Sequence, residues 1–421
     1  MISPGVFGRQ EGRLVSARCE VQFDHHSAEF AQAPHEVLAR VREKCPVAWT
    51  QAHGGYWVIT GYDEIGDALR DNETFSSHHD PEGPKQGVLL PPLPTQAGIL
   101  EMDPPEHHSV RKHLAPYFSP SAVDAMREEL LQLTTECIDD FIETGEAELI
   151  EQLASPVPAK LTVRLLGLPD SEWSVLADVF HKGAYLPSTE ENMAEIHGML
   201  LRVHGQLHEL VMDRRANPRD DVITSVANLR LDGELLPVEK AAGVLLNLAA
   251  GGIDTTTSLI AHTFVHLDRF PEHREFLLED PSRLRVACEE FLRVYPPVLG
   301  FARTVTAGCE FAGQELAKDD RVWVSFGAGN RDEKVFEDPD DIRLDRLPNR
   351  HASFGLGRHR CLGSNLARVI WHVVVGEVLR RLPDYRVDHG VAQRYPDCGD
   401  INGWVSVPVT FTPGPRAGGS R

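Results

Sequence analysis

The sequence lacks the features of a membrane protein. Its 421 residues contain no run that approaches the about 20 apolar residues needed to span a bilayer. The first residues also lack a charged segment followed by an apolar core, so we expect neither a signal peptide nor a membrane partner.

Basic residues are scarce in this chain. It has 42 Lys and Arg residues against 63 Asp and Glu residues, and its formal net charge is -21. A protein that binds nucleic acid non-specifically must neutralise phosphates with cations, so this balance argues against that class of function. A local basic patch stays compatible with these counts.

Cysteine is present but is not arranged in pairs. The number is odd, the residues are widely scattered and no C-x-x-C pair occurs, the positions being Cys19, Cys45, Cys137, Cys288, Cys309, Cys361 and Cys398. This pattern argues against a disulfide framework and against a structural zinc site. It predicts a protein of the reducing cytosol.

Several catalytic motifs are missing. Gly355 and Gly357 are not followed by the third glycine of a dinucleotide fingerprint, and no G-x-x-x-x-G-K-[ST] loop occurs. His262 and His266 have helical spacing, but no Glu follows the first histidine, so a zinc-protease motif is absent. A G-x-S-x-G nucleophile elbow is absent as well.

Helical periodicity dominates what is present. It covers most of residues 106–294, whereas strand patterns are short: a hairpin over 47–60 and strands over 321–326 and 404–411. Strands and helices do not alternate as a parallel sheet would require. We therefore predict a mainly α protein with small β-sheets (α+β). It would form a single domain over residues 21–411, with a loose N-terminal segment at 1–20 and a loose tail at 412–421.

The segment 237–267 has the composition of a long buried helix, yet residues 250–258 combine paired glycines with three threonines. These residues weaken a helix interior, and hydroxyls can bend it by bonding to carbonyls. Two interpretations stay open from the residues alone. The helix is broken into two, or it opens locally across a cavity and presents Asp254 and Thr255 there.

Cys361 differs from the other cysteines in its neighbours. Arg358, His359 and Arg360 precede it directly, and an apolar helical run begins at Leu366. Positive neighbours and a helix N-terminus both stabilise a thiolate over a thiol. We therefore predict that Cys361 is an activated cysteine and that it is not an inert core residue.

This segment resembles the haem-binding loop of the cytochrome P450 family, Phe-x-x-Gly-x-x-x-Cys-x-Gly, at Phe354, Gly357, Cys361 and Gly363. Three further segments resemble motifs of the same family in the same order. They are 103–107 with Arg111 (the helix that meets the haem propionates), 251–256 (the oxygen-activation motif) and Glu290 with Arg293 and Arg346 (the Glu-x-x-Arg network).

The resemblance implies the cytochrome P450 fold, with a long kinked central helix over haem b. It implies that Cys361 is the axial ligand of the haem iron and that Asp254 and Thr255 are an acid–alcohol pair that delivers protons. Glu290, Arg293 and Arg346 would form a structural network. The remaining cofactor-binding residues would be Phe354 and Gly363 of the loop and the propionate partners His107, Arg111, Arg303 and His359.

Placed by the same resemblance, the substrate pocket is overwhelmingly apolar. It suits a neutral or lipophilic small molecule, such as a terpenoid, a steroid, an aromatic compound or a polyketide. The residues expected to line it are Leu89, Leu90, Leu100, Tyr185, Leu248, Ala249, Gly252, Val298, Leu299, Phe301 and Ile401.

The activity implied is that of a monooxygenase that activates O2 to hydroxylate or epoxidise its substrate. By resemblance to soluble bacterial members, the protein would be a cytoplasmic monomer. Its electrons would come from NAD(P)H through a separate ferredoxin reductase and ferredoxin. Three alternatives stay open: an oxidative coupling enzyme of the same fold, a peroxide-driven enzyme, and a haem sensor or carrier without catalysis.

Overall fold

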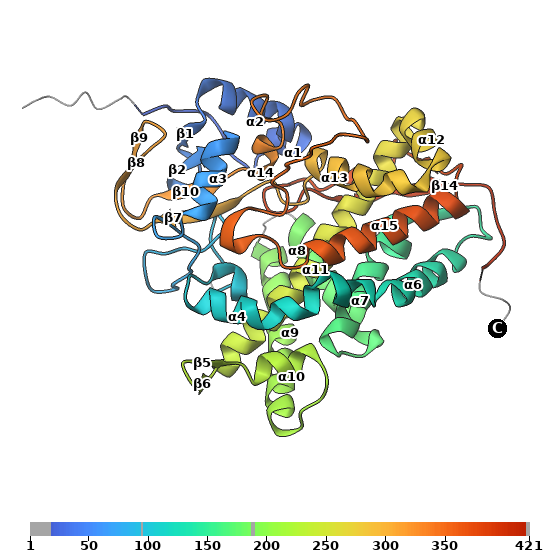
Figure 1. Cartoon of the computed structure of the whole chain (residues 1–421), viewed down its shortest axis with the longest axis horizontal. Coiled ribbons are helices and arrows are strands. Elements are labelled where there is room, and N and C mark those ends of the chain that lie inside the picture. The colour runs from blue at the N-terminus through green and yellow to red at the C-terminus, as the bar shows by residue number, and fades with distance from the viewer. Residues whose placement is uncertain (1–17, 94–95, 187–189, 418–421) are drawn as a thin grey trace, which may run out of the picture.

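A long helix, α11 (Val238–Arg269), lies at the centre of the molecule, and the other elements are arranged around it (Figure 1). The computed structural model describes residues 18–93, 96–186 and 190–417. The other α-helices are α1 (Ala28–Gln32), α2 (Pro34–Lys44), α3 (Tyr62–Arg70), α4 (Glu106–Leu114), α5 (Pro120–Asp124), α6 (Arg127–Asp139), α7 (Pro156–Leu166), α8 (Trp173–Tyr185), α9 (Glu190–Ala216), α10 (Val222–Ala227), α12 (Pro271–Glu279), α13 (Leu284–Val294), α14 (Phe326–Gly329) and α15 (Ser364–Arg381).

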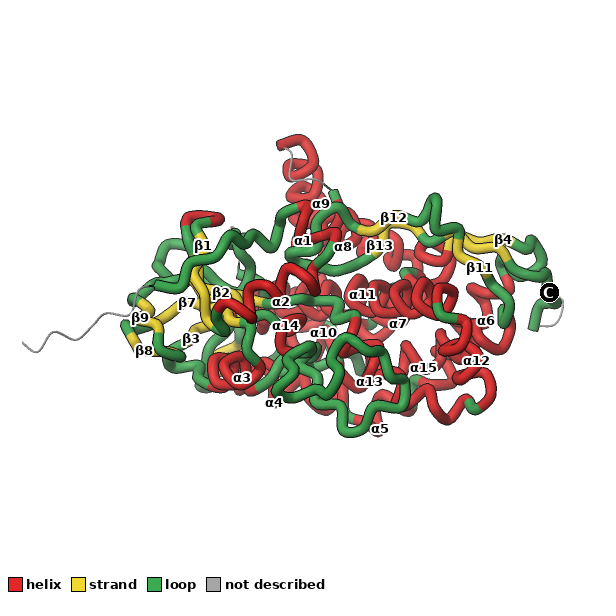
Figure 2. Tube along the Cα trace, turned by 90° about the horizontal axis from the view of Figure 1, so that it is seen from above, coloured by secondary structure: helices red, strands yellow, loops and turns green. Residues whose placement is uncertain are grey.

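Most strands lie toward the two ends of the molecule, with the helices between them (Figure 2). The hairpin over 230–235 is the exception and lies at the lower edge of Figure 1, near α10. The strands are β1 (Val47–Thr50), β2 (Tyr56–Ile59), β3 (Phe75–Ser76), β4 (Glu146–Glu148), β5 (Arg230–Leu231), β6 (Glu234–Leu235), β7 (Phe301–Val305), β8 (Cys309–Phe311), β9 (Gln314–Leu316), β10 (Arg321–Val324), β11 (Arg386–Val387), β12 (Gln393–Arg394), β13 (Trp404–Ser406) and β14 (Pro408–Thr410). The predicted combination of many helices with small sheets is confirmed.

Helix α11 is continuous, so the interpretation of two separate helices is wrong. The sequence indicated that a hydroxyl of this segment would bond a backbone carbonyl of the same helix. Thr255 Oγ1 makes such a bond and donates to the carbonyl of Gly251 at 2.9 Å. The helix packs against α7, α8, α9 and α15. Among the described residues it is also the one helix long and apolar enough to cross a membrane. That is weak evidence, since 61% of its apolar window is buried inside the protein.

The predicted hairpin over 47–60 forms the edge of a five-stranded sheet with the order β1-β2-β10-β7-β3. Strand β10 pairs with β7 in an antiparallel manner and with β2 in a parallel one, with Val322 opposite Trp57. The sequence analysis found no sign of parallel pairing. Its partners are far apart in the chain, and a parallel pair without a βα repeat between its strands leaves no local pattern.

The strand expected over 404–411 is divided at Val407. Strand β13 pairs with β12, whereas β14 pairs with β11 and β4, so the chain changes partner between them. The amide of Val407 donates to the side chain of Glu148 and its carbonyl accepts from Leu149, which satisfies the backbone at the break.

Both chain ends are more ordered than expected where the structure describes them. Cys19 forms a disulfide with Cys45, with the two Cα atoms 6.7 Å apart, although the scattered cysteines argued against disulfides. The amide of Trp49 donates to the carbonyl of Cys19 at 2.7 Å, so β1 holds this segment. Sequence spacing misses this pair because the sheet brings the cysteines together. The rest of the predicted loose N-terminal segment, residues 1–17, lies outside the described residues.

The C-terminal tail is bound to α6 and the loop after it. Gly414 donates to the carbonyl of Ile142 at 3.0 Å, and Ala417 donates to Asp139 Oδ1 at 3.0 Å. Within the tail that we expected to be loose, residues 412–417 thus include backbone groups with hydrogen-bond partners. Residues 418–421 lie outside the described part of the chain.

Candidate active site

The loop that carries Cys361 ends directly before α15, whose first residue is Ser364. The amide of Cys361 donates to the carbonyl of Phe354 at 2.7 Å, which closes the loop on itself. Gly357 has a positive φ of +68°, and a Cβ on it would come within 2.3 Å of the carbonyl of Leu69. Only glycine fits this close approach to the end of α3, so the glycine of the loop has a steric cause.

Cys361 lies in a recess of the protein: its side chain is accessible, yet protein atoms surround it closely enough to desolvate it. Burial raises the pKa of its thiol, and the Gly363 backbone and the charges of Arg111 and Arg360 oppose this rise. The positive neighbours expected from the sequence are therefore present, but for the protein alone desolvation is stronger. A metal cation on the sulfur reverses this balance, because a coordinating thiol is deprotonated.

A cluster of four side chains that carry or can carry positive charge lies beside the Cys361 loop. It consists of His107, Arg111, Arg303 and His359. The rings of His107 and His359 lie 4.0 Å apart between centroids. Burial and the charges of Arg303, His107 and Arg111 lower the pKa of His359 to about 2. Burial and Arg111 lower the pKa of His107 to about 4, and burial lowers the pKa of Arg303 to about 10. The cluster repels further protons and favours anions.

Two observations show that this cluster fits the carboxylates of a bound group. Nε2 of His359 is buried and has no hydrogen-bond partner within the protein. Arg303 is 3% exposed, and its Nη1 donates to the carbonyl of Ala302 at 2.7 Å. A soft sulfur ligand beside unsatisfied buried donors is the donor set for an iron porphyrin with anionic propionates.

Glu290, Arg293 and Arg346 are brought together in a buried ion network. Arg293 binds Glu290 through both carboxylate oxygens, at 2.7 and 2.8 Å, and Arg346 Nε lies 3.2 Å from Glu290 Oε1. Two partners escaped the sequence analysis: Nδ2 of Asn349 at 2.9 Å and the amide of Arg343 at 2.8 Å from the same carboxylate. Glu290 and Arg293 are fully buried, and the ion pairs and hydrogen bonds lower the pKa of Glu290 against the effect of burial.

Asp254 projects from α11 into a polar cluster that the sequence analysis missed. The hydroxyl of Tyr395 donates to its carboxylate, 3.0 Å from Oδ1 and 3.2 Å from Oδ2. Nδ1 of His181, on α8, lies 3.1 Å from the same Oδ1 and 2.7 Å from the Tyr395 hydroxyl. No local pattern links these residues, because they come from α8, α11 and the segment after β12.

The alcohol of the predicted pair has a different partner from the acid. Thr255 is half-buried, and its hydroxyl bonds the carbonyl of Gly251, whereas Asp254 is buried and bonds Tyr395 and His181. A Cβ on Gly252 would come within 2.7 Å of Thr162 Oγ1, so α7 packs closely against α11 beside this pair.

The residues expected to line a substrate pocket fall into two groups. Leu90 and Leu299 are buried in the core around the N-terminal sheet, and Ala249 is buried in the core between α11 and its neighbouring helices. The others are partly exposed and stay candidates for a lining: Leu89, Leu100, Tyr185, Leu248, Gly252, Val298, Phe301 and Ile401.

Comparison with known proteins agrees with this arrangement. The sequence model of the family described as Cytochrome P450 matches residues 161–399. Linalool 8-monooxygenase of Pseudomonas putida is 32% identical over 83% of this chain and 90% of its own length. Erythromycin C-12 hydroxylase of Saccharopolyspora erythraea is 33% identical over 83% of this chain and 87% of its own.

Among solved structures, a Mycobacterium marinum cytochrome P450 in complex with pseudoionone superimposes with a TM-score of 0.86 at 27% identity. The match covers 94% of this chain and 100% of the other. The haem-loop motif, the buried Glu290 network and these likenesses lead to one assignment. The chain belongs to the cytochrome P450 family of monooxygenases.

Proposed function

We propose that this protein is a haem-thiolate monooxygenase that inserts one atom of O2 into a lipophilic small molecule by hydroxylation or epoxidation. The observation that carries the proposal is the position of Cys361, in a recess beside the cluster of His107, Arg111, Arg303 and His359. When bound, haem b supplies the activation of O2, for which a thiolate ligand favours cleavage of the O–O bond.

In this proposal the chain holds the cofactor at two places. Cys361 supplies the sulfur ligand, and the loop from Phe354 to Gly363 fixes its direction. Arg303 and His359 would take the propionates. Arg303 is a buried cation, and the half-buried His359 has an Nε2 atom without a partner in the protein. His107 and Arg111 of α4 would complete this anion site.

Asp254 and Thr255 would move protons to the site of reaction. A carboxylate transfers a proton when it lies within hydrogen-bond reach of the donor or of a connecting water. Asp254 already accepts a hydrogen bond from Tyr395 and lies beside His181, which is 20% exposed and leads toward the solvent. Tyr395 and His181 would thus position Asp254, while the Thr255 hydroxyl, on the next residue of α11, would hydrogen-bond the oxygen substrate.

For the substrate we propose a neutral or lipophilic compound of the terpenoid, steroid, aromatic or polyketide type. The names of two relatives, a linalool monooxygenase and an erythromycin hydroxylase, support this range. The partly exposed candidate lining residues are mainly apolar, among them Leu89, Leu248 and Phe301, which favours contact with apolar carbon.

Electrons would come from NAD(P)H through a ferredoxin reductase and a ferredoxin. Arg358 and Arg360 are exposed in the Cys361 loop, and Lys112 is exposed on α4 next to Arg111. They would form a basic patch on a chain whose net charge is -21. Such a patch can attract an acidic iron–sulfur protein in spite of the overall charge. We place the enzyme in the bacterial cytoplasm as a monomer. The relatives named above are bacterial proteins, which supports a bacterial origin.

The absorption spectrum of the reduced protein exposed to carbon monoxide tests the proposal. A strongly red-shifted Soret band is expected, because only a thiolate ligand produces it. Cys361→Ser should lose this band, whereas Cys288→Ser, a buried cysteine in the core near α15, should keep it. A protein that binds no haem, or an unchanged band in Cys361→Ser, would overturn the proposal.

A further inference from the structure

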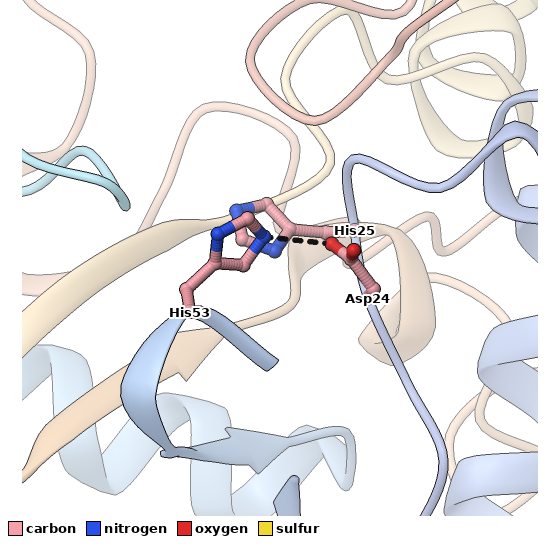
Figure 3. Close-up of side chains that lie close together, drawn as sticks. All are labelled: Asp24, His25 and His53. Carbon is pink, nitrogen blue, oxygen red and sulfur yellow. Dashed lines mark hydrogen bonds and ion pairs between the residues drawn. The ribbon is translucent and has the colours of Figure 1, made fainter. Parts of the chain in front are cut away.

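A cluster of His25, His26, His53 and Asp24 lies outside the site described above. Asp24 and His25 precede α1, and His53 lies in the turn between β1 and β2 (Figure 3). One ligand atom from each of Asp24, His25 and His53 lies within 4.8 Å of the other two. In the described part of the chain this is the one group of three such side chains placed closely enough to hold a metal ion.

The hydrogen bonds of His25 fix its tautomer. Its Nε2 lies 2.8 Å from the carbonyl of Leu90, which can only accept, so Nε2 carries the proton. Its Nδ1 therefore has the lone pair, and it accepts from the Tyr56 hydroxyl at 2.9 Å. Burial and the neighbouring charge of His26 lower the pKa of His25 to about 3, so the ring is neutral under ordinary conditions. A neutral imidazole whose other nitrogen bonds a carbonyl is the usual form of a metal-bound histidine.

Asp24 and His53 already face each other. Nε2 of His53 lies 2.8 Å from Asp24 Oδ1, the contact drawn as a dashed line in Figure 3. Both side chains are partly exposed, at 39% for Asp24 and 27% for His53, so an ion can reach them from solvent. A metal ion would take the place of the proton that these two groups share.

The charges around the cluster are of both signs. His26, with its ring 5.4 Å from that of His53, is paired with Asp397 at 2.8 Å. Asp397 offsets part of the positive charge of His26, although that charge still lowers the pKa of His25. Asp24 supplies a negative charge directly at the cluster and acts on His25 in the opposite direction. The charge of Asp400 also raises the pKa of His26. Burial raises the pKa of Asp400 itself.

We propose that Asp24, Nδ1 of His25 and Nε2 of His53 bind one zinc ion, with water as the fourth ligand. Tetrahedral bonds of about 2.0–2.1 Å place ligand atoms about 3.3 Å apart. The contact of 2.8 Å between Asp24 and His53 would therefore open by roughly 0.5 Å, and separations of up to 4.8 Å would close by up to roughly 1.5 Å. The zinc ion takes the place of the Tyr56 hydroxyl on Nδ1, while Nε2 of His25 keeps its bond to Leu90. The site would join the N-terminal segment, the β1–β2 turn and the loop of Leu90, and it does not depend on the proposed haem chemistry.

The test is titration of the full chain with zinc chloride after removal of metals with a chelator. Isothermal titration calorimetry should show one saturable site, and zinc should raise the melting temperature. Asp24→Asn and His53→Asn should each weaken binding by at least about tenfold. Asparagine is chosen for position 53 because it tolerates the positive φ of +50° there. The melting temperature of each metal-free variant checks that it folds.

A matched control changes one histidine of a pair whose i, i+4 spacing on a helix also suits zinc. His204 and His208 lie one turn apart on α9, and His208 is 3.6 Å from Glu239. His208→Gln should leave the tight site unchanged. Absence of saturable zinc binding overturns the proposal, and so does binding that His208→Gln removes but His53→Asn does not.

Discussion

The hydroxyl of Tyr395 lies 3.0 Å from Oδ1 of Asp254, although 141 positions separate the two residues in the chain. Burial and the neighbouring carboxylate raise the pKa of Tyr395 far above its ordinary value, so it stays a proton-bearing donor. The acid of α11 is therefore held by a neutral donor and by His181. The orientation of the Asp254 carboxylate therefore does not depend on α11 alone.

Replacing Tyr395 with phenylalanine removes this donor and keeps the ring. In Tyr395→Phe we expect the fraction of NAD(P)H converted into oxidised product to fall by up to about tenfold, because the carboxylate is less well placed to transfer protons. Product formation per reductant consumed is the measurement, together with the solvent isotope effect on turnover, which should rise.

Tyr185→Phe is the matched control, since Tyr185 stacks on Tyr395 with ring centroids 5.9 Å apart but belongs to α8. Tyr185 is itself a candidate for the pocket lining, so Tyr185→Phe should lower the coupling, but by much less than Tyr395→Phe does. Equal losses in both variants would show that the tyrosines only line the pocket, and an unchanged isotope effect in Tyr395→Phe would show that Tyr395 does not position Asp254.

Thr255 offers a second test of proton delivery. Thr255→Ala removes the hydroxyl that bonds the carbonyl of Gly251, and we expect reductant to be consumed mainly to form hydrogen peroxide. Peroxide yield per NAD(P)H is the measurement. Thr255→Ser keeps the hydroxyl and should restore most of the coupling, whereas equal uncoupling in both variants would mean that the methyl group is what matters.

The Glu290 network makes a prediction about stability. Glu290→Gln leaves Arg293 and Arg346 buried without their counter-charge, and removal of one partner from a buried ion pair costs about 3–5 kcal/mol. Urea unfolding followed by circular dichroism measures the loss. Glu279→Gln, whose side chain pairs with Arg283 on the surface, should cost less than about 1 kcal/mol. A similar small cost for Glu290→Gln would contradict the assigned role.

The sequence predicted these features to different degrees, and for physical reasons. Glu290 and Arg293 are three positions apart on one helix, so their contact follows from helix geometry. The loop of Cys361 is likewise local. The contacts of Asp254 with Tyr395 and His181 and the Cys19–Cys45 disulfide depend instead on how distant segments pack. No spacing rule encodes such pairs, and the same holds for the parallel pairing of β2 with β10.

His26 makes a prediction about pH. Burial by itself would lower its pKa, but the hydrogen bond to Asp397 and the charges of Asp400 and Asp397 raise it from 6.5 to about 9. A pKa that folding raises stabilises the protein fully below about pH 6.5, and this stabilisation is lost as the pH rises through about 9. His26→Gln should therefore cost up to about 3 kcal/mol near pH 6 and much less near pH 10, measured by urea unfolding with a chelator present. His108→Gln, at an exposed position of α4, is the control, and its effect on the free energy of unfolding should be the same at both pH values. An equal cost of His26→Gln at both pH values would mean that the charge of His26 does not stabilise the fold.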